Sequence, residues 1–206
     1  MTPEKRAIDL ALAFVCILLL AMPALFIAAL LLLVQGRPVF FLSERMHSQE
    51  QRFFLWKFRT MRLAQNDFGV SGGDKRGRIT ALGRVLRRTR LDEVPQLWNI
   101  LRGDLSFVGP RPPLPVYVSR YPALYAQVLQ NRPGLTGLAT LVFHKREEAL
   151  LAHAMTPQET DAIYMRRCIP RKARLDMIYA QRTTVRLDIL ILMQTVSRVF
   201  GKARSA

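Results

Sequence analysis

The sequence predicts an α+β protein that is mostly helical, with a membrane-embedded helix at its N-terminus and one small β-hairpin. Three observations support this fold class: an uncharged apolar run at residues 10–34, two aromatic-rich runs that follow it, and helical patterns punctuated by proline and glycine in the remainder. We expect two parts, a membrane helix at residues 1–36 and a cytoplasmic domain at residues 37–206 that rests on the membrane surface.

The apolar run is long enough to cross a bilayer. It carries no charge from Leu10 to Val34, and about 25 residues span roughly 37 Å as a helix. Pro23 lies at its middle, where proline removes a backbone donor and forces a kink or a break. Two shapes follow: a kinked span, or a re-entrant helix that turns at Pro23 and leaves on the side it entered.

Charges on both flanks of the run favour the re-entrant shape. Lys5 and Arg6 precede it and Arg37 follows it, so the positive-inside rule places both flanks in the cytoplasm. A cleaved signal peptide is a third interpretation, but the run is long for that role and no convincing small-residue cleavage site closes it. The sequence therefore predicts a re-entrant membrane helix broken at Pro23.

Beyond the membrane segment the chain is strongly basic. The chain has 31 Lys and Arg against 15 Asp and Glu, a formal charge of +16. Residues 1–36 sum to zero, so the whole excess lies on residues 37–206. Such a domain is drawn to nucleic acid, anionic lipid headgroups or phosphorylated substrates, and charge alone does not choose among them.

Cysteine and histidine are scarce. Cys16 lies in the apolar run and Cys168 in a basic stretch, so we expect no disulfide between them and a reducing setting. The three histidines include His144 and His153, which we interpret as incidental. A zinc site has almost no ligands to draw on, and any metal should be a hard, oxygen-bound ion.

The remaining elements follow in order. Residues 39–45 and 52–60 predict a short hairpin, and residues 64–80 a polar, glycine-rich loop. Further on, the patterns predict a basic helix at 81–90, helices at 92–101, 115–130, 144–154 and 157–167, an extended segment at 106–115, a turn-rich junction at 132–137 and an apolar helix at 185–200. The last helix is apolar over much of its surface, which suits either a core or a membrane-surface position.

Two adjacent acidic residues stand out within this pattern. Asp92 and Glu93 precede Pro95, and proline fits only in the first turn of a helix, so the N-cap should lie between Leu91 and Val94. Acidic residues at helix starts usually serve only as partners of the helix dipole. This pair, however, is surrounded by arginines, at positions 84, 87, 88 and 90 upstream and 102 and 111 downstream.

Such surroundings suit phosphoryl chemistry. An aspartate can attack phosphorus and form an acyl phosphate, which divides one hard displacement into two easier ones. Attacking carboxylate and phosphate are both anionic, so they need arginines and a divalent metal to meet. Mg²⁺, held by one or two carboxylates and substrate phosphates, fits that task.

The chain resembles the small monotopic phosphoglycosyl transferases of the bacterial sugar transferase group. The matching segments are Lys5-Arg6 with Asp9, RPVFFLSER at 37–45, WKFRTM at 56–61, the block at 78–112 that contains LDEVPQLWN, RPGLTG at 132–137 and the segment at 174–196. The resemblance covers most of the chain, and it implies the complete fold: a re-entrant membrane helix, a small β-hairpin and amphipathic interfacial helices around a catalytic helix.

The resemblance also implies a reaction. Such enzymes work at the cytoplasmic face of the inner membrane and start glycan assembly on undecaprenyl phosphate, for an exopolysaccharide, O-antigen, capsule or glycoprotein. Asp92 would attack the phosphate next to the sugar of a UDP-sugar and expel UMP, and a polyprenol phosphate would then take the phosphosugar. Glu93 would complete the pair by assisting metal or proton handling. Mg²⁺ would bind Asp92, membrane lipid would surround the enzyme, and a homodimer is left open.

Four basic residues match the family's positions and are expected to hold phosphates: Lys57, Arg59, Arg87 and Arg111. One segment departs from the family. After the TG of RPGLTG many members carry a WAQVNGR-like stretch thought to contribute to nucleotide or sugar recognition, whereas this chain has LATLVFHKREE at 138–148. The sugar and the contacts to the nucleotide base are therefore not defined by the sequence.

Two other functional classes compete with the enzyme. A membrane-tethered nucleic-acid-binding protein suits the charge, but no helix-turn-helix, OB or RRM pattern is found and the carboxylates would repel nucleic acid. A non-catalytic scaffold is the second rival, against which the intact carboxylate pair argues. We therefore expect no nucleic-acid partner.

Overall fold

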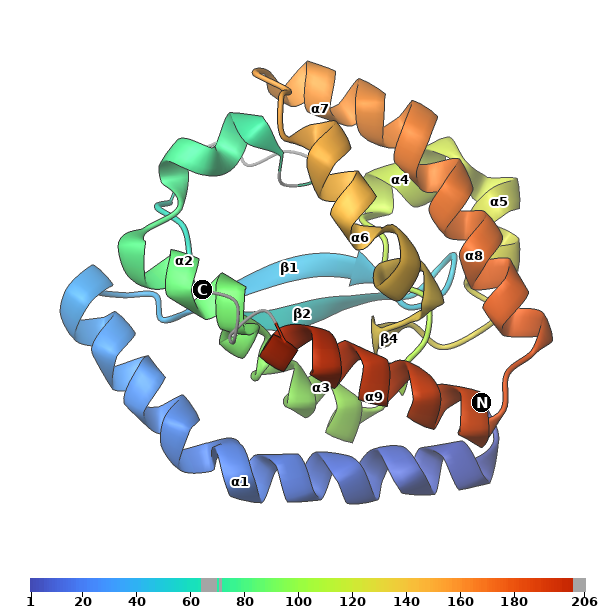
Figure 1. The fold of residues 1–206 in the computed structure, drawn as a ribbon, viewed down its shortest axis with the longest axis horizontal. Coiled ribbons are helices and arrows are strands. Elements are labelled where there is room, and N and C mark those ends of the chain that lie inside the picture. Colours follow the sequence, from blue (N-terminus) through green and yellow to red (C-terminus); the bar gives the residue numbers. More distant parts are fainter. Residues whose placement is uncertain (64–69, 71, 202–206) are drawn as a thin grey trace.

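The computed structural model describes residues 1–63, 70 and 72–201, and it is mostly helical. A β-hairpin of strands β1 (Phe40–Met46) and β2 (Arg52–Phe58) lies near the middle of the molecule, with helices around it (Figure 1). The mostly helical α+β class is confirmed. Part of the predicted loop at 64–80 lies outside the described residues, and Gly73–Arg78 within it form a 3-10 helix.

Helix α1 (Pro3–Gln35) contains the predicted membrane segment. The Thr2 side chain caps its start by accepting from the Lys5 amide, and the helix ends at Gly36, whose positive φ of 69° favours glycine. The helix is continuous through Pro23 and bends near its middle (Figure 1). The predicted break is therefore wrong: proline removes one hydrogen bond, and the remaining bonds of the ladder hold a bent helix together.

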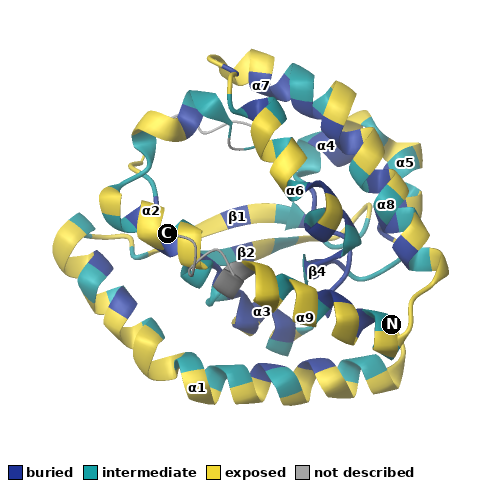
Figure 2. Cartoon of the chain, in the orientation of Figure 1, coloured by how far each residue is buried: buried dark blue, intermediate teal, exposed yellow. Residues whose placement is uncertain are grey.

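Most of α1 is exposed, as the yellow surface of Figure 2 shows, and its buried residues are Asp9, Ala13, Ile27 and Leu31. By length and composition it is the one helix among the described residues that could cross a membrane. Exposed leucine and phenylalanine at this density suit lipid rather than water. The re-entrant arrangement and the division at residue 36 stay predictions.

The hairpin is confirmed, with Phe40 opposite Phe58 and Met46 opposite Arg52. On β2, Phe58 and Leu55 are buried. Phe54, the neighbour of Leu55, is exposed, as expected for successive residues on opposite faces of a hairpin. Its covered face packs toward α3 (Gln96–Arg102), whose buried Leu97 and Ile100 share a core with Leu55 and with Ala13 of α1. Helix α3 thus lies between α1 and the hairpin.

The acidic pair lies just before α3. Helix α2 (Ala81–Thr89), capped by Thr80, agrees with the prediction for 81–90. A single 3-10 turn at Leu91–Glu93 follows, and the N-cap of α3 is Pro95. The expected cap between Leu91 and Val94 is thus wrong by at least one position, because the carboxylates occupy a separate 3-10 turn that leads into the α-helix.

A second, two-stranded sheet was not predicted. Strand β3 (Ser106–Val108) pairs in parallel with β4 (Gly134–Thr136), which comes from the segment expected to be a turn-rich junction. The strands approach so closely that a Cβ at Gly134 would lie 2.1 Å from the Gly109 amide nitrogen. Only glycine allows this approach, and the same residue had suggested a turn.

The remaining helices depart from prediction in their boundaries. The expected helix at 115–130 is divided into α4 (Pro115–Arg120) and α5 (Pro122–Val128), because Pro122 disfavours helical backbone at Tyr121. Helix α6 (Leu138–Leu151) begins earlier than expected. Helix α7 (Pro157–Ile163) continues through a π-helical turn at Tyr164–Cys168 into α8 (Ile169–Gln181), and α9 (Val185–Gly201) agrees with prediction. Both cysteines are free, as expected.

Candidate active site

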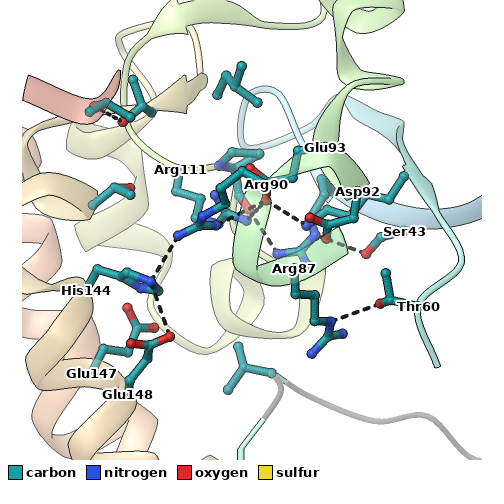
Figure 3. Close-up of a pocket in the computed structure, with 18 of the residues that line it drawn as sticks. Ser43, Thr60, Arg87, Arg90, Asp92, Glu93, Arg111, His144, Glu147 and Glu148 are labelled. Atoms are coloured by element: carbon teal, nitrogen blue, oxygen red, sulfur yellow. Dashed lines mark hydrogen bonds and ion pairs between the residues drawn. The ribbon is translucent and has the colours of Figure 1, made fainter. Parts of the chain in front are cut away.

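The carboxylate pair lines a large cavity. Asp92 and Glu93 are buried, and the cavity, about 1800 Å³ in volume, is bordered by α1, α2, the hairpin, α6, α8 and α9. Arg90, directly before the pair, has a φ of 60°, a left-handed backbone that arginine rarely adopts. This residue turns the chain between α2 and the 3-10 turn, so the side chains on both sides of it face the same space (Figure 3).

Glu93 is the centre of a cluster of cations. Its Oε1 accepts from Arg111 Nη2 at 2.8 Å and from Lys57 Nζ at 3.2 Å, and Arg90 Nη1 lies 3.6 Å away. Burial alone would raise the pKa of Glu93, but Arg111, Lys57 and Arg90 together hold it well below its usual range. A carboxylate so firmly ionised is a poor proton acceptor, which disfavours the expected proton-handling role and favours one in positioning the cations.

The cations respond to the same burial. The pKa of Lys57 falls to about 8 because of burial, although Glu93 opposes the change. Arg45 of β1 also lines the cavity, and it donates to Ser43 Oγ and to the Pro112 carbonyl, each at 3.1 Å. Burial, and then Arg111, lower the pKa of Arg45 to about 10. Positive charge is thus concentrated around Glu93, whose single negative charge compensates it only in part.

Asp92 has the opposite environment to its neighbour. Its Oδ1 is buried and has no hydrogen-bond partner. Burial, and then the charge of Glu93, raise the pKa of Asp92, while Lys57, Arg87 and Arg90 oppose the rise. A buried acceptor without a partner is costly, and Asp92 belongs to the lining of the cavity, where a ligand could supply the missing partner.

Three of the four predicted phosphate-binding residues lie near the carboxylate pair, and the fourth does not. Lys57 and Arg111 contact Glu93, and Arg87 of α2 donates from Nε to Thr60 Oγ1 at 2.9 Å while its charge acts on Asp92. Arg59 is engaged elsewhere: it donates to the carbonyl oxygens of Gln35, Gly36 and Arg37 at 2.5, 2.9 and 3.1 Å.

Arg59 therefore caps the C-terminal end of α1, where backbone carbonyls lack partners within the helix. Its phosphate-binding role stays a prediction that these contacts disfavour. The sequence could not reveal this use, because the partners of Arg59 are backbone groups 22 to 24 residues away.

His144 is a site residue that the sequence interpretation missed. It lies on α6, in the segment that departs from the family, with Nε2 2.9 Å from Arg90 Nη2 and 3.3 Å from Glu148 Oε1 (Figure 3). A guanidinium can only donate, so the histidine nitrogen accepts. Burial, and then Arg90, lower the pKa of His144, which agrees with a neutral ring. No local pattern signals a contact between residues 54 positions apart.

The site also tests the expected metal. Among the described residues no cluster of three or more His, Cys, Asp or Glu side chains could hold an ion by itself. One carboxylate oxygen without a partner, on Asp92, is what a magnesium ion held mainly by substrate phosphates would need from the protein. The residues thus fit a metal that binds together with an anionic substrate.

The fold and this site together define a protein with a long apolar helix and a basic cavity around a buried carboxylate pair. Residues 2–202 match the family described as bacterial sugar transferase, and the chain belongs to this family. The resemblance noted in the sequence is thereby confirmed, and with it the assignment of the chain as an enzyme.

The relatives that match this chain have different lengths. An uncharacterized sugar transferase, EpsL of Bacillus subtilis, is 34% identical over 95% of this chain and 86% of its own length. An undecaprenyl-phosphate glucose phosphotransferase of Komagataeibacter xylinus is 33% identical, and a UDP-glucose:undecaprenyl-phosphate glucose-1-phosphate transferase of Escherichia coli is 32% identical, each over 95% of this chain. The chain spans only 35% and 40% of those two relatives.

Proposed function

We propose that the chain transfers a phosphosugar from a UDP-sugar to a polyprenol phosphate, giving a polyprenyl diphosphate sugar and UMP. The relatives from Komagataeibacter and Escherichia are named for transfer to undecaprenyl phosphate, and the latter for UDP-glucose as donor. The long apolar helix α1 suits an enzyme whose acceptor is a lipid. The proposed location is the cytoplasmic face of the inner membrane, where the product would start a bacterial glycan.

One observation carries the proposed mechanism: Asp92 lines the cavity with a buried Oδ1 that has no hydrogen-bond partner, while the adjacent Glu93 holds three cations. A residue placed only to stabilise the fold would use that oxygen in a hydrogen bond. Three cations surround the single negative charge of Glu93, and the positive charge that remains suits the binding of a diphosphate.

In the first step an oxygen of the Asp92 carboxylate attacks the phosphorus next to the sugar. The bond from that phosphorus to the bridging oxygen breaks, and UMP leaves with the electron pair, so Asp92 carries the phosphosugar as an acyl phosphate. In the second step a phosphate oxygen of the polyprenol phosphate attacks the same phosphorus. The acyl phosphate bond breaks and Asp92 is released as a carboxylate.

The cations have a defined task in both steps. Lys57 and Arg111 lie beside Glu93, where they would bind the nonbridging phosphate oxygens and stabilise the charge that develops on UMP. Arg87 approaches Asp92 from α2 and would hold the donor in line with the attacking oxygen. Magnesium, when bound by Asp92 and the phosphates, would further screen the repulsion between the two anions.

The first half-reaction tests the covalent step. With a UDP-sugar and no polyprenol phosphate, the purified enzyme should release up to about one equivalent of UMP and gain the mass of one phosphosugar. Asp92→Asn keeps the shape of the side chain but loses the charged nucleophile, so it should give neither signal.

Glu44→Gln is the matched control, because Glu44 is an exposed residue of the hairpin that pairs with Arg52 at the surface. It should release UMP like the wild type. If the wild type formed no adduct, and product appeared only when both substrates were present, direct attack by the lipid phosphate would replace this mechanism.

A further inference from the structure

The cavity that contains the carboxylates has an apolar arm that the chemistry above does not use. On α1 this arm is lined by Ile8, Leu12 and Val15, and on α9 by Ile189, Met193 and Val196. Both sets follow the spacing i, i+4, i+7, which places three side chains on one face of a helix. Each helix therefore presents an apolar stripe to the same space, and most of these side chains remain exposed.

Buried polar contacts fix the two helices at one end of the arm. Lys5 Nζ near the start of α1 pairs with Asp188 of α9, and it also donates to the Val108 carbonyl at 3.0 Å and to the Tyr179 hydroxyl at 3.1 Å. From this junction the helices run in the same general direction and diverge (Figure 1). The two apolar stripes follow this junction along their helices, and both line the same cavity, which we call the groove between α1 and α9.

The C-terminal half of α9 contacts β4 and α6. Thr195 Oγ1 lies 3.0 Å from Thr136 Oγ1 of β4, and Arg198 donates to the Leu141 carbonyl of α6. Because these contacts hold α9 at both ends, we expect α9 to keep its distance from α1 when the groove contains no ligand.

The apolar arm is continuous with the carboxylate site. Leu97, Phe107 and Leu135 line the same cavity and share a hydrophobic cluster with Leu12 of α1 and Leu192 of α9. Val94, two residues after Asp92, also lines the cavity. Beyond this point Arg87 and Arg111 border the same cavity. One cavity therefore has a long apolar part beside the membrane helix and a basic part at the nucleophile.

We propose that the groove between α1 and α9 holds the isoprenoid chain of the polyprenol phosphate and brings its phosphate to Asp92. This inference rests on the proposed function and names the acceptor subsite within it. A molecule with one phosphate on a long apolar chain matches the two parts of the cavity, because the apolar stripes exclude charge and the basic end attracts it. A UDP-sugar, which has no apolar chain, needs only the basic end.

The two half-reactions separate this subsite from the donor site. Met193→Trp places a bulky ring in the groove at a position that is exposed and outside the core. It should release UMP from the UDP-sugar at the wild-type rate, while its KM for undecaprenyl phosphate rises about tenfold or more. A short polyprenol phosphate of two isoprene units, which does not fill the groove, should be affected less.

Leu33→Trp is the matched control, since Leu33 lies on α1, is 83% exposed and does not line the cavity. It should leave both half-reactions unchanged. An unchanged KM for undecaprenyl phosphate in Met193→Trp would overturn the subsite. Absence of UMP release from the wild type when both substrates are present would instead refute the proposed function.

Photocrosslinking gives an independent readout on the unmodified enzyme. A polyprenol phosphate with a photoreactive terminal isoprene should label α9 peptides, and excess undecaprenyl phosphate should suppress the label. If phosphatidylglycerol suppressed it equally well, the groove would be a general site for lipid acyl chains and the proposal would be wrong. Absence of label on both α1 and α9 would contradict it as well.

Discussion

Asp92 and Glu93 are neighbours in the chain, yet their carboxyl groups have opposite pKa shifts. Glu93 faces Arg111, Lys57 and Arg90 and stays ionised, whereas burial, with Glu93 beside it, raises the pKa of Asp92. Two titratable groups pushed apart in this way are a common mark of divided roles in catalysis. Here the division separates Asp92, the proposed nucleophile, from Glu93, which holds the cations.

The pH dependence of UMP release should report this division. Protonated Asp92 cannot attack, so the rate should fall as the pH drops through its raised pKa, at a higher pH than for an ordinary aspartate. On the alkaline side the rate should fall near pH 8, where Lys57 loses its proton and its charge. Single-turnover rates measured across pH should therefore give a bell-shaped profile.

Substitution at Glu93 and Lys57 identifies the two limbs. Glu93→Gln removes a charge that raises both pKa values, so both limbs should move to lower pH while the maximum rate falls. Lys57→Arg should move the alkaline limb upward and leave the acid limb in place. An acid limb unaffected by Glu93→Gln would show that another group titrates there.

Metal dependence is also argued at the residue scale, from the unpartnered Asp92 Oδ1. EDTA should abolish UMP release and added magnesium should restore it, because the attacking carboxylate and the diphosphate repel each other. Binding of the UDP-sugar, followed by calorimetry with and without EDTA, provides a readout that does not depend on turnover. Full activity and unchanged binding in metal-free buffer would exclude this role of the metal.

At the scale of elements, a buried polar network joins α1, α8, α9 and β3. Lys5 pairs with Asp188, and Tyr179 donates to Asp188 Oδ1 at 2.6 Å and to the Val108 carbonyl at 3.3 Å. At the opposite end of α1, Arg59 binds the last carbonyl groups of the helix. Polar contacts thus attach both ends of the membrane helix to the domain, while lipid is free to contact its middle.

Asp188→Ala should destabilise the protein by about 3 kcal/mol, because it leaves the Lys5 ammonium buried without its charge partner. Thermal unfolding in detergent, monitored by circular dichroism, would measure the shift. The control Glu44→Gln disrupts a surface ion pair, in which the Arg52 and Glu44 side chains are 60% and 43% exposed, whereas those of Lys5 and Asp188 are 12% and 11% exposed. It should lower the free energy of unfolding by less than about 0.5 kcal/mol. Equal effects of the two substitutions would show that burial does not strengthen this network.

At the scale of the whole molecule, the bend of α1 decides how the protein sits in the membrane. If the helix re-enters, both of its ends face the cytoplasm, as the basic flanks require. Thr2→Cys should then escape an impermeant thiol reagent in intact cells and react after permeabilisation. Labelling of Thr2→Cys from the periplasm would establish a spanning helix.

Two controls sharpen this topology test. Glu50→Cys, on the exposed turn of the hairpin, marks the cytoplasmic domain and should behave in the same way. The wild type measures the background from Cys168, which is buried, and Cys16, which is half-buried within α1.

Much of this protein follows from its sequence alone. The membrane helix, the hairpin, the basic helix before the acidic pair and the family are readable in the chain, because each depends on runs or spacings within a few tens of residues. The placement of Lys57, Arg87 and Arg111 near Asp92 also agrees with expectation, since the family resemblance carries information on long-range contacts that composition does not.

Tertiary structure decided the rest. The continuity of α1 through Pro23, the parallel pairing of β3 with β4 and the capping of α1 by Arg59 depend on partners distant in sequence. The contact of Arg90 with His144 and the opposed pKa shifts of the acidic pair also arise only when the chain folds, because burial and neighbouring charge set them. Sequence determined which groups the site contains, and packing determined that Glu93 holds the cations while Asp92 Oδ1 is buried without a partner.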